Sequence, residues 1–234
     1  MNDDLERGLG RLHAPDERDR KYLLSLPPEI KEVAENRTHR YHYYETILDQ
    51  GNSSACTGAA FWQWADMGPI RNHNKPDFMT LYKMNQKVDE WPGEEPLYEG
   101  SSVRASFRVG QQLGFVKSYR WAFDLETVVN HLLTVGPVVL GTDWTRDAMR
   151  TDEHGFVHFD GSVVGGHAYT ARGASRVKRC PDGSLGGIRC LQSWGDAWGE
   201  NGLFWISFKD MEKLIKANGE ACTAFEQLAP AQPA

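Results

Sequence analysis

The sequence lacks long apolar runs and stripes of basic residues, and each absence excludes a class of partner. No apolar stretch approaches the roughly 18 residues of a membrane-spanning helix, and the polar N-terminus is unlike a signal peptide. The net charge is −6, and lysine and arginine form no stripe, which argues against binding to nucleic acid. We therefore expect no membrane partner, no nucleic-acid partner and a cytoplasmic location.

Cysteine is also scarce, with four in 234 residues: Cys56, Cys180, Cys190 and Cys222. If one of them is a nucleophile, an odd number remains, which argues against a disulfide framework and for a reducing compartment. Cys180 and Cys190 flank a turn-rich tip, where we expect two free thiols, with a bridge across the hairpin as the alternative. No Cys-x2-Cys pair and no phosphate-binding loop occur, so no metal and no cofactor are expected.

One stretch of the chain carries a pattern for acyl transfer. Gln50 lies six residues before Cys56, and Ser53 and Ser54 stand just before that cysteine. Serines cap helices, so the pattern predicts a helix over 52–67 with Cys56 in its first turn. Unpaired N–H groups and the helix dipole favour a thiolate there. The thiolate would attack a carbonyl, and the Cys56 N–H and the Gln50 amide would hold the resulting oxyanion.

A thiolate nucleophile needs a base, and the second half of the chain offers one. Residues 165–169 read Gly-Gly-His-Ala-Tyr, which places His167 on a predicted strand after two glycines that let a substrate chain approach. Residues 191–202 follow on a predicted neighbouring strand and contain Gln192, whose amide could orient the imidazole. His131 and His158 are the competing histidines.

Together these motifs resemble the papain-like cysteine peptidases. The spacing Gln-x5-Cys, the Gly-His-Ala strand and the run Ser-Trp-Gly-x2-Trp-Gly-Glu-Asn-Gly occur in the family's order, over about residues 25–227. Gln192 stands where the family usually has Asn, and Thr57 stands where it has Trp. The upstream disulfide cysteine is absent. The chain therefore resembles a bacterial or phage type that lacks the long inhibitory propeptide.

The resemblance implies an α+β, papain-like fold with a helical lobe, an antiparallel β-barrel-like lobe and an active site in the cleft between them. The chain's own pattern agrees, because helix-like segments precede strand-like ones. The expected boundaries are a charged N-terminal arm over 1–25, a mainly helical lobe with the nucleophile over 26–136, a mainly β lobe with the histidine over 137–227, and a flexible tail over 228–234. Within the arm, residues 16–20 are expected to be solvated, with packing across the body as the alternative that the resemblance implies.

The implied activity is that of a thiol protease, a cysteine peptidase that hydrolyses peptide bonds through a Cys56 thioester with His167 as general base and acid. The implied catalytic residues are Cys56, His167, Gln192 and Gln50. The implied substrate-binding residues are Gly100, Ser101, Ser102, Val103, Gly165, Gly166, Trp194 and Trp198. A peptide or protein substrate is expected, and a protein partner that controls activity and the oligomeric state stay open. The alternatives are a deamidase or transacylase on the same site, or an inactive peptide-binding or structural module.

Overall fold

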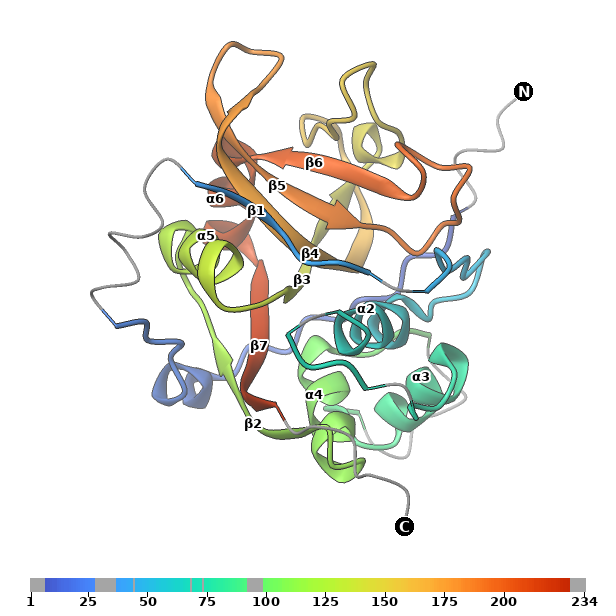
Figure 1. Ribbon diagram of the computed structural model, residues 1–234. Helices are drawn as coiled ribbons and strands as arrows, with labels where there is room; N and C mark the ends of the chain where they lie inside the picture. Colours follow the sequence, from blue (N-terminus) through green and yellow to red (C-terminus); the bar gives the residue numbers. More distant parts are fainter. Residues whose placement is uncertain are drawn as a thin grey trace.

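The computed structural model describes residues 7–27, 37–43, 45–67, 69–72, 74–91 and 99–227. The tail expected at 228–234 lies outside these residues. Within them, helices pack against one antiparallel sheet (Figure 1), which confirms the expected α+β class. None of the helices in the described ranges is long and apolar enough to cross a bilayer.

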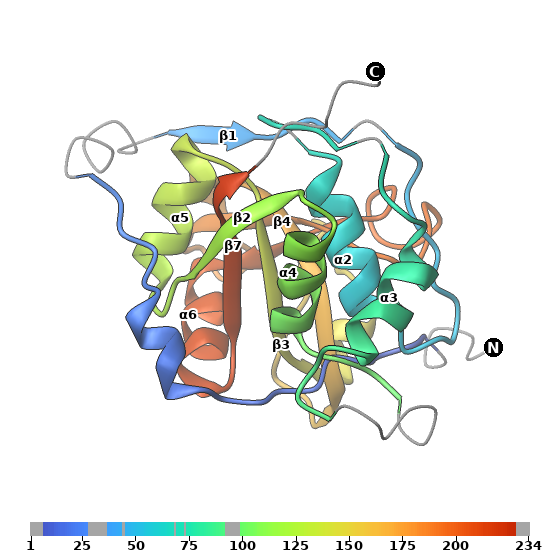
Figure 2. The same ribbon diagram turned by 90° about the horizontal axis from the view of Figure 1, so that it is seen from below.

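Three helices pack against one another on one side of the molecule (Figures 1 and 2): α2 (Cys56–Ala65), α3 (Phe78–Gln86) and α4 (Val103–Gln112). Two of them begin at capping side chains. The Asp77 carboxylate accepts from the N–H groups of Met79 and Thr80 at the start of α3. The Ser102 hydroxyl accepts from the Ala105 N–H at the start of α4.

Helix α2 begins at Cys56 without a side-chain cap, so the capping expected of Ser53 and Ser54 is wrong. The Ser53 hydroxyl donates to the Gln50 carbonyl at 2.7 Å instead, and the Ser54 hydroxyl donates to the Glu99 carboxylate at 2.9 Å. The helix is buried on nearly every side because it lies against α3, α4 and the sheet.

In the described residues seven strands form the sheet, in the order β2-β7-β3-β4-β5-β6 with β1 added on β4. The strands are β1 (Thr38–Arg40), β2 (Val116–Trp121), β3 (Val138–Thr145), β4 (Val163–Arg179), β5 (Leu185–Leu191), β6 (Leu203–Ser207) and β7 (Glu220–Gln227). Every pairing is antiparallel. In the described part of the chain β2 pairs with β7 and β6 with β5, so the two edges stay apart. The barrel-like expectation is corrected to an open sheet.

The sheet also contains a strand from the range that was expected to be mainly helical. Strand β2 pairs with β7, although residues 26–136 were expected to be mainly helical. Helix α5 (Leu125–Thr134) contacts β1, β3 and β4 rather than the three-helix group, and helix α6 (Phe208–Ala217) contacts β5 and β6. Two short 3-10 helices complete the described elements: η2 (Glu17–Lys21) and η3 (Asp147–Met149).

Two large apolar clusters hold the fold together. One joins α5 and α6 to the sheet around Trp144 and Phe204. The other joins the three-helix group to the sheet, and in it the rings of Phe61, Trp64 and Phe107 meet with centroids 5.2 to 5.4 Å apart. The second cluster includes Cys56, so it fixes the start of α2 against strand β4.

Candidate active site

Strand β4 and the residue after β5 bring His167 and Gln192 together. His167 Nε2 donates to Gln192 Oε1 at 2.5 Å, and the Ser193 N–H donates to the same oxygen at 3.0 Å. Since an amide oxygen only accepts, the imidazole proton lies on Nε2 and the lone pair lies on Nδ1. In the described part of the chain Nδ1 has no hydrogen-bond partner. The ring is therefore held in the tautomer that a base at Nδ1 requires.

Two tryptophans enclose this pair. The Trp194 ring stacks on His167 with centroids 4.8 Å apart, and Trp144 meets the imidazole edge-on at 4.9 Å. His167 and Gln192 are fully buried, so the hydrogen bond between them is shielded from water and strengthened. Trp198 packs edge-on against Trp194 at 5.3 Å and donates to the Met149 carbonyl.

Cys56 is the first residue of α2, and its side chain is fully buried. Burial raises the pKa of the Cys56 thiol to about 11, although N–H groups of Ala168, Gly10 and Thr57 oppose the shift. Burial lowers the pKa of His167 to about 4, and the bond to Gln192 opposes this. Both shifts favour the neutral thiol and imidazole in this closed arrangement, which argues against the thiolate expected at Cys56. Desolvation outweighs the helix N-terminus.

The Gln50 amide is fixed from two sides. Its Oε1 accepts from the Ser193 hydroxyl at 2.6 Å, which ties it to the residue after Gln192. Its Nε2 donates to the Gly8 carbonyl at 3.0 Å and to the Ser53 carbonyl at 2.6 Å. An amide donor thus already holds a peptide carbonyl in this site.

That carbonyl belongs to the arm segment, residues 8–12, which lies across the site. The N–H groups of Gly10 and Arg11 donate to the Gly166 carbonyl at 3.0 and 2.9 Å. The Ser101 N–H donates to the Gly10 carbonyl at 2.9 Å. The arm segment therefore pairs with β4 on one side and with the residue before α4 on the other.

The arm segment fits because its glycines carry no side chain. A Cβ at Gly8 would lie 1.9 Å from the Ser53 carbonyl oxygen, and one at Gly10 would lie 2.0 Å from the Ser54 carbonyl oxygen. Real Cβ atoms do not approach backbone so closely, so any larger residue would displace the segment. A surface cavity of about 400 Å³ continues beside it.

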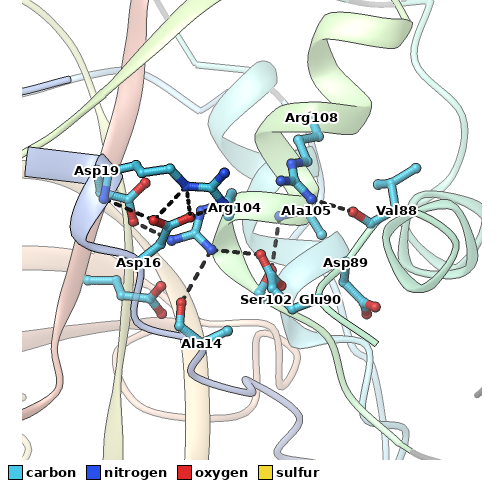
Figure 3. Close-up of polar contacts among 12 residues, drawn as sticks. Ala14, Asp16, Asp19, Val88, Asp89, Glu90, Ser102, Arg104, Ala105 and Arg108 are labelled. Atoms are coloured by element: carbon cyan, nitrogen blue, oxygen red, sulfur yellow. Dashed lines mark hydrogen bonds and ion pairs between the residues drawn. The ribbon is translucent and has the colours of Figure 1, made fainter. Parts of the chain in front are cut away.

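A second contact holds the N-terminal chain to helix α4 (Figure 3). The Arg104 guanidinium donates to the Ala14 carbonyl at 3.2 Å and to the Glu90 carboxylate at 2.8 Å, and it also pairs with Asp19. Arg104, in α4, is 4% exposed. Arg18, in the N-terminal chain that Arg104 contacts, is exposed to solvent. Residues 16–20 thus combine both expectations, because Glu17, Arg18 and Arg20 are exposed while Asp19 is held against helix α4 by Arg104.

The substrate-binding residues expected from the resemblance fall into two groups. Four of them meet the arm segment closely: Gly100, Ser101, Gly165 and Gly166. Trp194 joins them, because its Nε1 donates to the Gly8 carbonyl at 3.2 Å. The others serve the fold in this structure, with Ser102 as a helix cap, Val103 in the apolar cluster and Trp198 packed on Trp194.

Sequence reasoning missed a buried ion cluster beside the site. Arg11 Nε donates to Glu220 Oε2 at 2.8 Å, and Arg11 Nη1 lies 3.4 Å from Asp143 Oδ1. Arg11 and Glu220 are 209 positions apart, and no motif marks either of them. Only the pairing of Glu220 with Gly141 across β7 and β3 brings the carboxylate to this place.

The described residues contain no group of three or more His, Cys, Asp or Glu side chains that could hold a metal ion. All four cysteines are free and buried, which confirms the expected free thiols at Cys180 and Cys190. The chemistry available here is that of the thiol, the imidazole and the amides.

Comparison with known proteins supports the resemblance drawn from the motifs. No protein-family model matches the chain. A curated cathepsin B-like cysteine proteinase from Schistosoma japonicum is 31% identical over 88 residues, which are 38% of this chain and 24% of that protein. The chain thus matches about a quarter of the length of this curated relative.

Solved structures match over nearly the whole chain. They show that the fold is that of the papain-like cysteine proteases, as expected from the motifs. Xylellain, a cysteine protease from Xylella fastidiosa, superposes with a TM-score of 0.66 and 14% identity over 97% of both chains. Procathepsin B S9 from Trypanosoma congolense superposes with a TM-score of 0.63 and 12% identity, over 94% of this chain and 87% of the other.

Proposed function

We propose that this chain is a cysteine peptidase that hydrolyses peptide bonds of peptides or proteins through a thioester on Cys56. One observation carries the proposal: His167 Nε2 donates a hydrogen bond to Gln192 Oε1. This bond keeps the proton on Nε2, so the lone pair on Nδ1 is free to accept the thiol proton. The thiol lies against the N–H of Ala168, the neighbour of His167 in β4. Nucleophile and base therefore come from facing elements.

The proposed reaction has two halves. In the first, His167 Nδ1 takes the Cys56 proton, and Sγ forms a bond to the carbonyl carbon of the substrate. Gln50 Nε2 and the Cys56 N–H hold the oxyanion. The carbon–nitrogen bond then breaks, and His167 gives its proton to the departing amine, which leaves a thioester. In the second half His167 takes a proton from a water molecule, and the water oxygen attacks the thioester carbon. The bond to Sγ then breaks, the carboxylic acid product is released, and Sγ takes the proton back from His167.

The arm segment indicates how a substrate backbone would bind. Its Gly8 carbonyl lies on Gln50 Nε2, where an attacked carbonyl would sit. Its backbone also uses the Gly166 carbonyl and the Ser101 N–H, which a substrate would use in the same way. Catalysis therefore requires the arm segment to leave first.

The test uses full-length protein with Gly10→Ala, which displaces the arm segment because its Cβ would strike the Ser54 carbonyl. We expect this variant to cleave an unfolded protein such as casein and to react with a peptidyl epoxide such as E-64, with the adduct mapped to Cys56. The same protein with Cys56→Ala as well is the control and should do neither. A folded Gly10→Ala variant that neither cleaves casein nor reacts with the epoxide would contradict the proposal.

A further inference from the structure

The place of Gln192 depends on its backbone, because only one end of its side-chain amide is held. Its Oε1 accepts from His167 Nε2 and from the Ser193 N–H, whereas its Nε2 has no hydrogen-bond partner in the described part of the chain. Gln192 also follows β5, whose pairing with β4 ends at Leu191 and Thr170. The ladder between these two strands therefore does not reach Gln192, and other contacts must fix it.

Two hydrogen bonds fix the Gln192 backbone. Its N–H donates to the Gly202 carbonyl at 2.8 Å. Its carbonyl accepts from Gln63 Nε2 at 2.9 Å, although the two residues are 129 positions apart. Gln63 and Gln192 are both fully buried. Loss of the Gln63 donor would therefore leave a buried carbonyl unsatisfied, which is costly in free energy.

Gln63 belongs to the helix that begins at the nucleophile. It follows Cys56 by seven residues in α2, and this spacing places both side chains on one face of the helix, roughly 20° apart. Both side chains also meet β4, because the Ala168 N–H approaches the Cys56 thiol and the Thr170 hydroxyl lies 3.4 Å from Gln63 Oε1. The same hydroxyl donates to the Ala60 carbonyl at 2.8 Å. Gln63 therefore connects the helix of the nucleophile to the residue that orients the imidazole.

We propose that Gln63 is a positioning residue that holds Gln192 where its side-chain oxygen fixes the His167 imidazole relative to Cys56. The proposal rests on the peptidase function above and adds a residue that acts at the same site. Gln63 acts through the Gln192 backbone, and its full burial keeps it away from the substrate. It should therefore affect the chemical step rather than substrate binding.

The first measurement is kcat and KM on one cleavable peptide, in full-length Gly10→Ala protein. Gln63→Met keeps the length of the side chain and removes the donor. We expect it to lower kcat by roughly 10-fold and to change KM by less than about twofold, because a small displacement of a catalytic group slows the reaction steeply.

Thr223→Val is the matched control. It removes another buried hydrogen bond to a backbone carbonyl, that of Thr223 to Pro137 at 2.9 Å, and neither partner belongs to the site. It should keep the kcat and KM of the parent. If Gln63→Met does not fold, Gln63→Asn takes its place and should act in the same direction, since its amide is withdrawn by one carbon–carbon bond.

The second measurement follows the imidazole proton by NMR in the wild-type protein, where the arm segment is in place. The short, buried bond from His167 Nε2 to Gln192 should give a proton signal far downfield that exchanges slowly with water. Its absence from His167→Gln protein assigns it. We expect Gln63→Met to move this signal upfield and to speed its exchange, whereas Thr223→Val should leave both unchanged.

The two measurements separate this proposal from the peptidase function. Parent kcat, or an unmoved imidazole signal, in a folded Gln63 variant would overturn the role of Gln63 while the peptidase function stands. Equal losses of kcat in the Gln63 and Thr223 variants would also overturn it, since loss of any buried hydrogen bond would then explain them. A Gly10→Ala parent that cleaves neither the peptide nor casein would overturn the peptidase function, and the imidazole signal would then decide whether Gln63 positions the ring.

Discussion

At the scale of single residues, Gln192 is where this site departs most from the family's motif. The longer side chain still reaches the imidazole, since its Oε1 lies 2.5 Å from His167 Nε2. The Ser193 N–H fixes that oxygen from the other side. The additional methylene is thus accommodated within the buried contact.

Gln192→Ala should lower kcat by roughly 10- to 100-fold, because the imidazole loses the acceptor that fixes its tautomer and orientation. Gln192→Asn should give an intermediate loss, since the carbonyl is kept but withdrawn by about 1.5 Å, one carbon–carbon bond. KM should change little, because Gln192 is fully buried beside Trp194. The measurement is kcat and KM on one cleavable peptide in the Gly10→Ala background.

Circular dichroism controls for folding in this comparison. Restoration of part of the activity by Asn distinguishes orientation of the ring from simple packing. Wild-type kcat in a folded Gln192→Ala variant would show that Cys56 and His167 work without an orienting amide.

At the scale of elements, the arm segment is the part that decides whether the nucleophile is accessible. It pairs with Gly166 and Ser101 on opposite sides, and its Arg11 side chain pairs with the Glu220 carboxylate. Arg104 holds the chain that follows (Figure 3). The Gly10 N–H approaches the Cys56 thiol, which is fully buried between the arm segment and the apolar cluster of the three-helix group.

Gly10→Ala should raise the rate of Cys56 alkylation by iodoacetamide by roughly 10-fold or more, because displacing the arm segment exposes the thiol and weakens the desolvation that raises its pKa. Gly136→Ala is the matched control, since a Cβ there meets nothing nearer than 3.6 Å. Mass spectrometry of alkylated peptides follows each cysteine. Equal Cys56 rates in wild type and both variants would show that the arm segment does not shield the thiol.

At the scale of the whole molecule, buried histidines link stability to pH. His131 in α5 is buried, and desolvation lowers its pKa to about 4. Because its folded pKa lies below the unfolded value of about 6.5, the unfolded state binds more protons as the pH falls. The stability that His131 provides above pH 6.5 is therefore lost between pH 6.5 and 4.

Between pH 7 and pH 5, wild type should lose about 2 kcal/mol more unfolding free energy than His131→Phe, which cannot take up this proton. Urea unfolding at both pH values measures the difference. The comparison cancels other groups, including Glu220, whose raised pKa acts in the opposite direction. Parallel pH dependence in the two proteins would mean that His131 does not contribute.

The sequence by itself determined the α+β class and the residues proposed for the chemistry. Gln50 and Cys56 are close in the chain, and glycines and tryptophans mark the strands around His167 and Gln192. Such signals are local, because spacing along one helix or strand determines which side chains share a face.

Only the tertiary structure decided which distant segments meet at the site. The pairing of β7 with β3 sets Glu220 opposite Gly141, and the arm segment then brings Arg11 to it from the far end of the chain. Burial in the packed molecule also raises the pKa of the Cys56 thiol, which opposes the expected thiolate. Desolvation and contacts between distant segments depend on the packed whole, so no pattern within a short window of sequence encodes them.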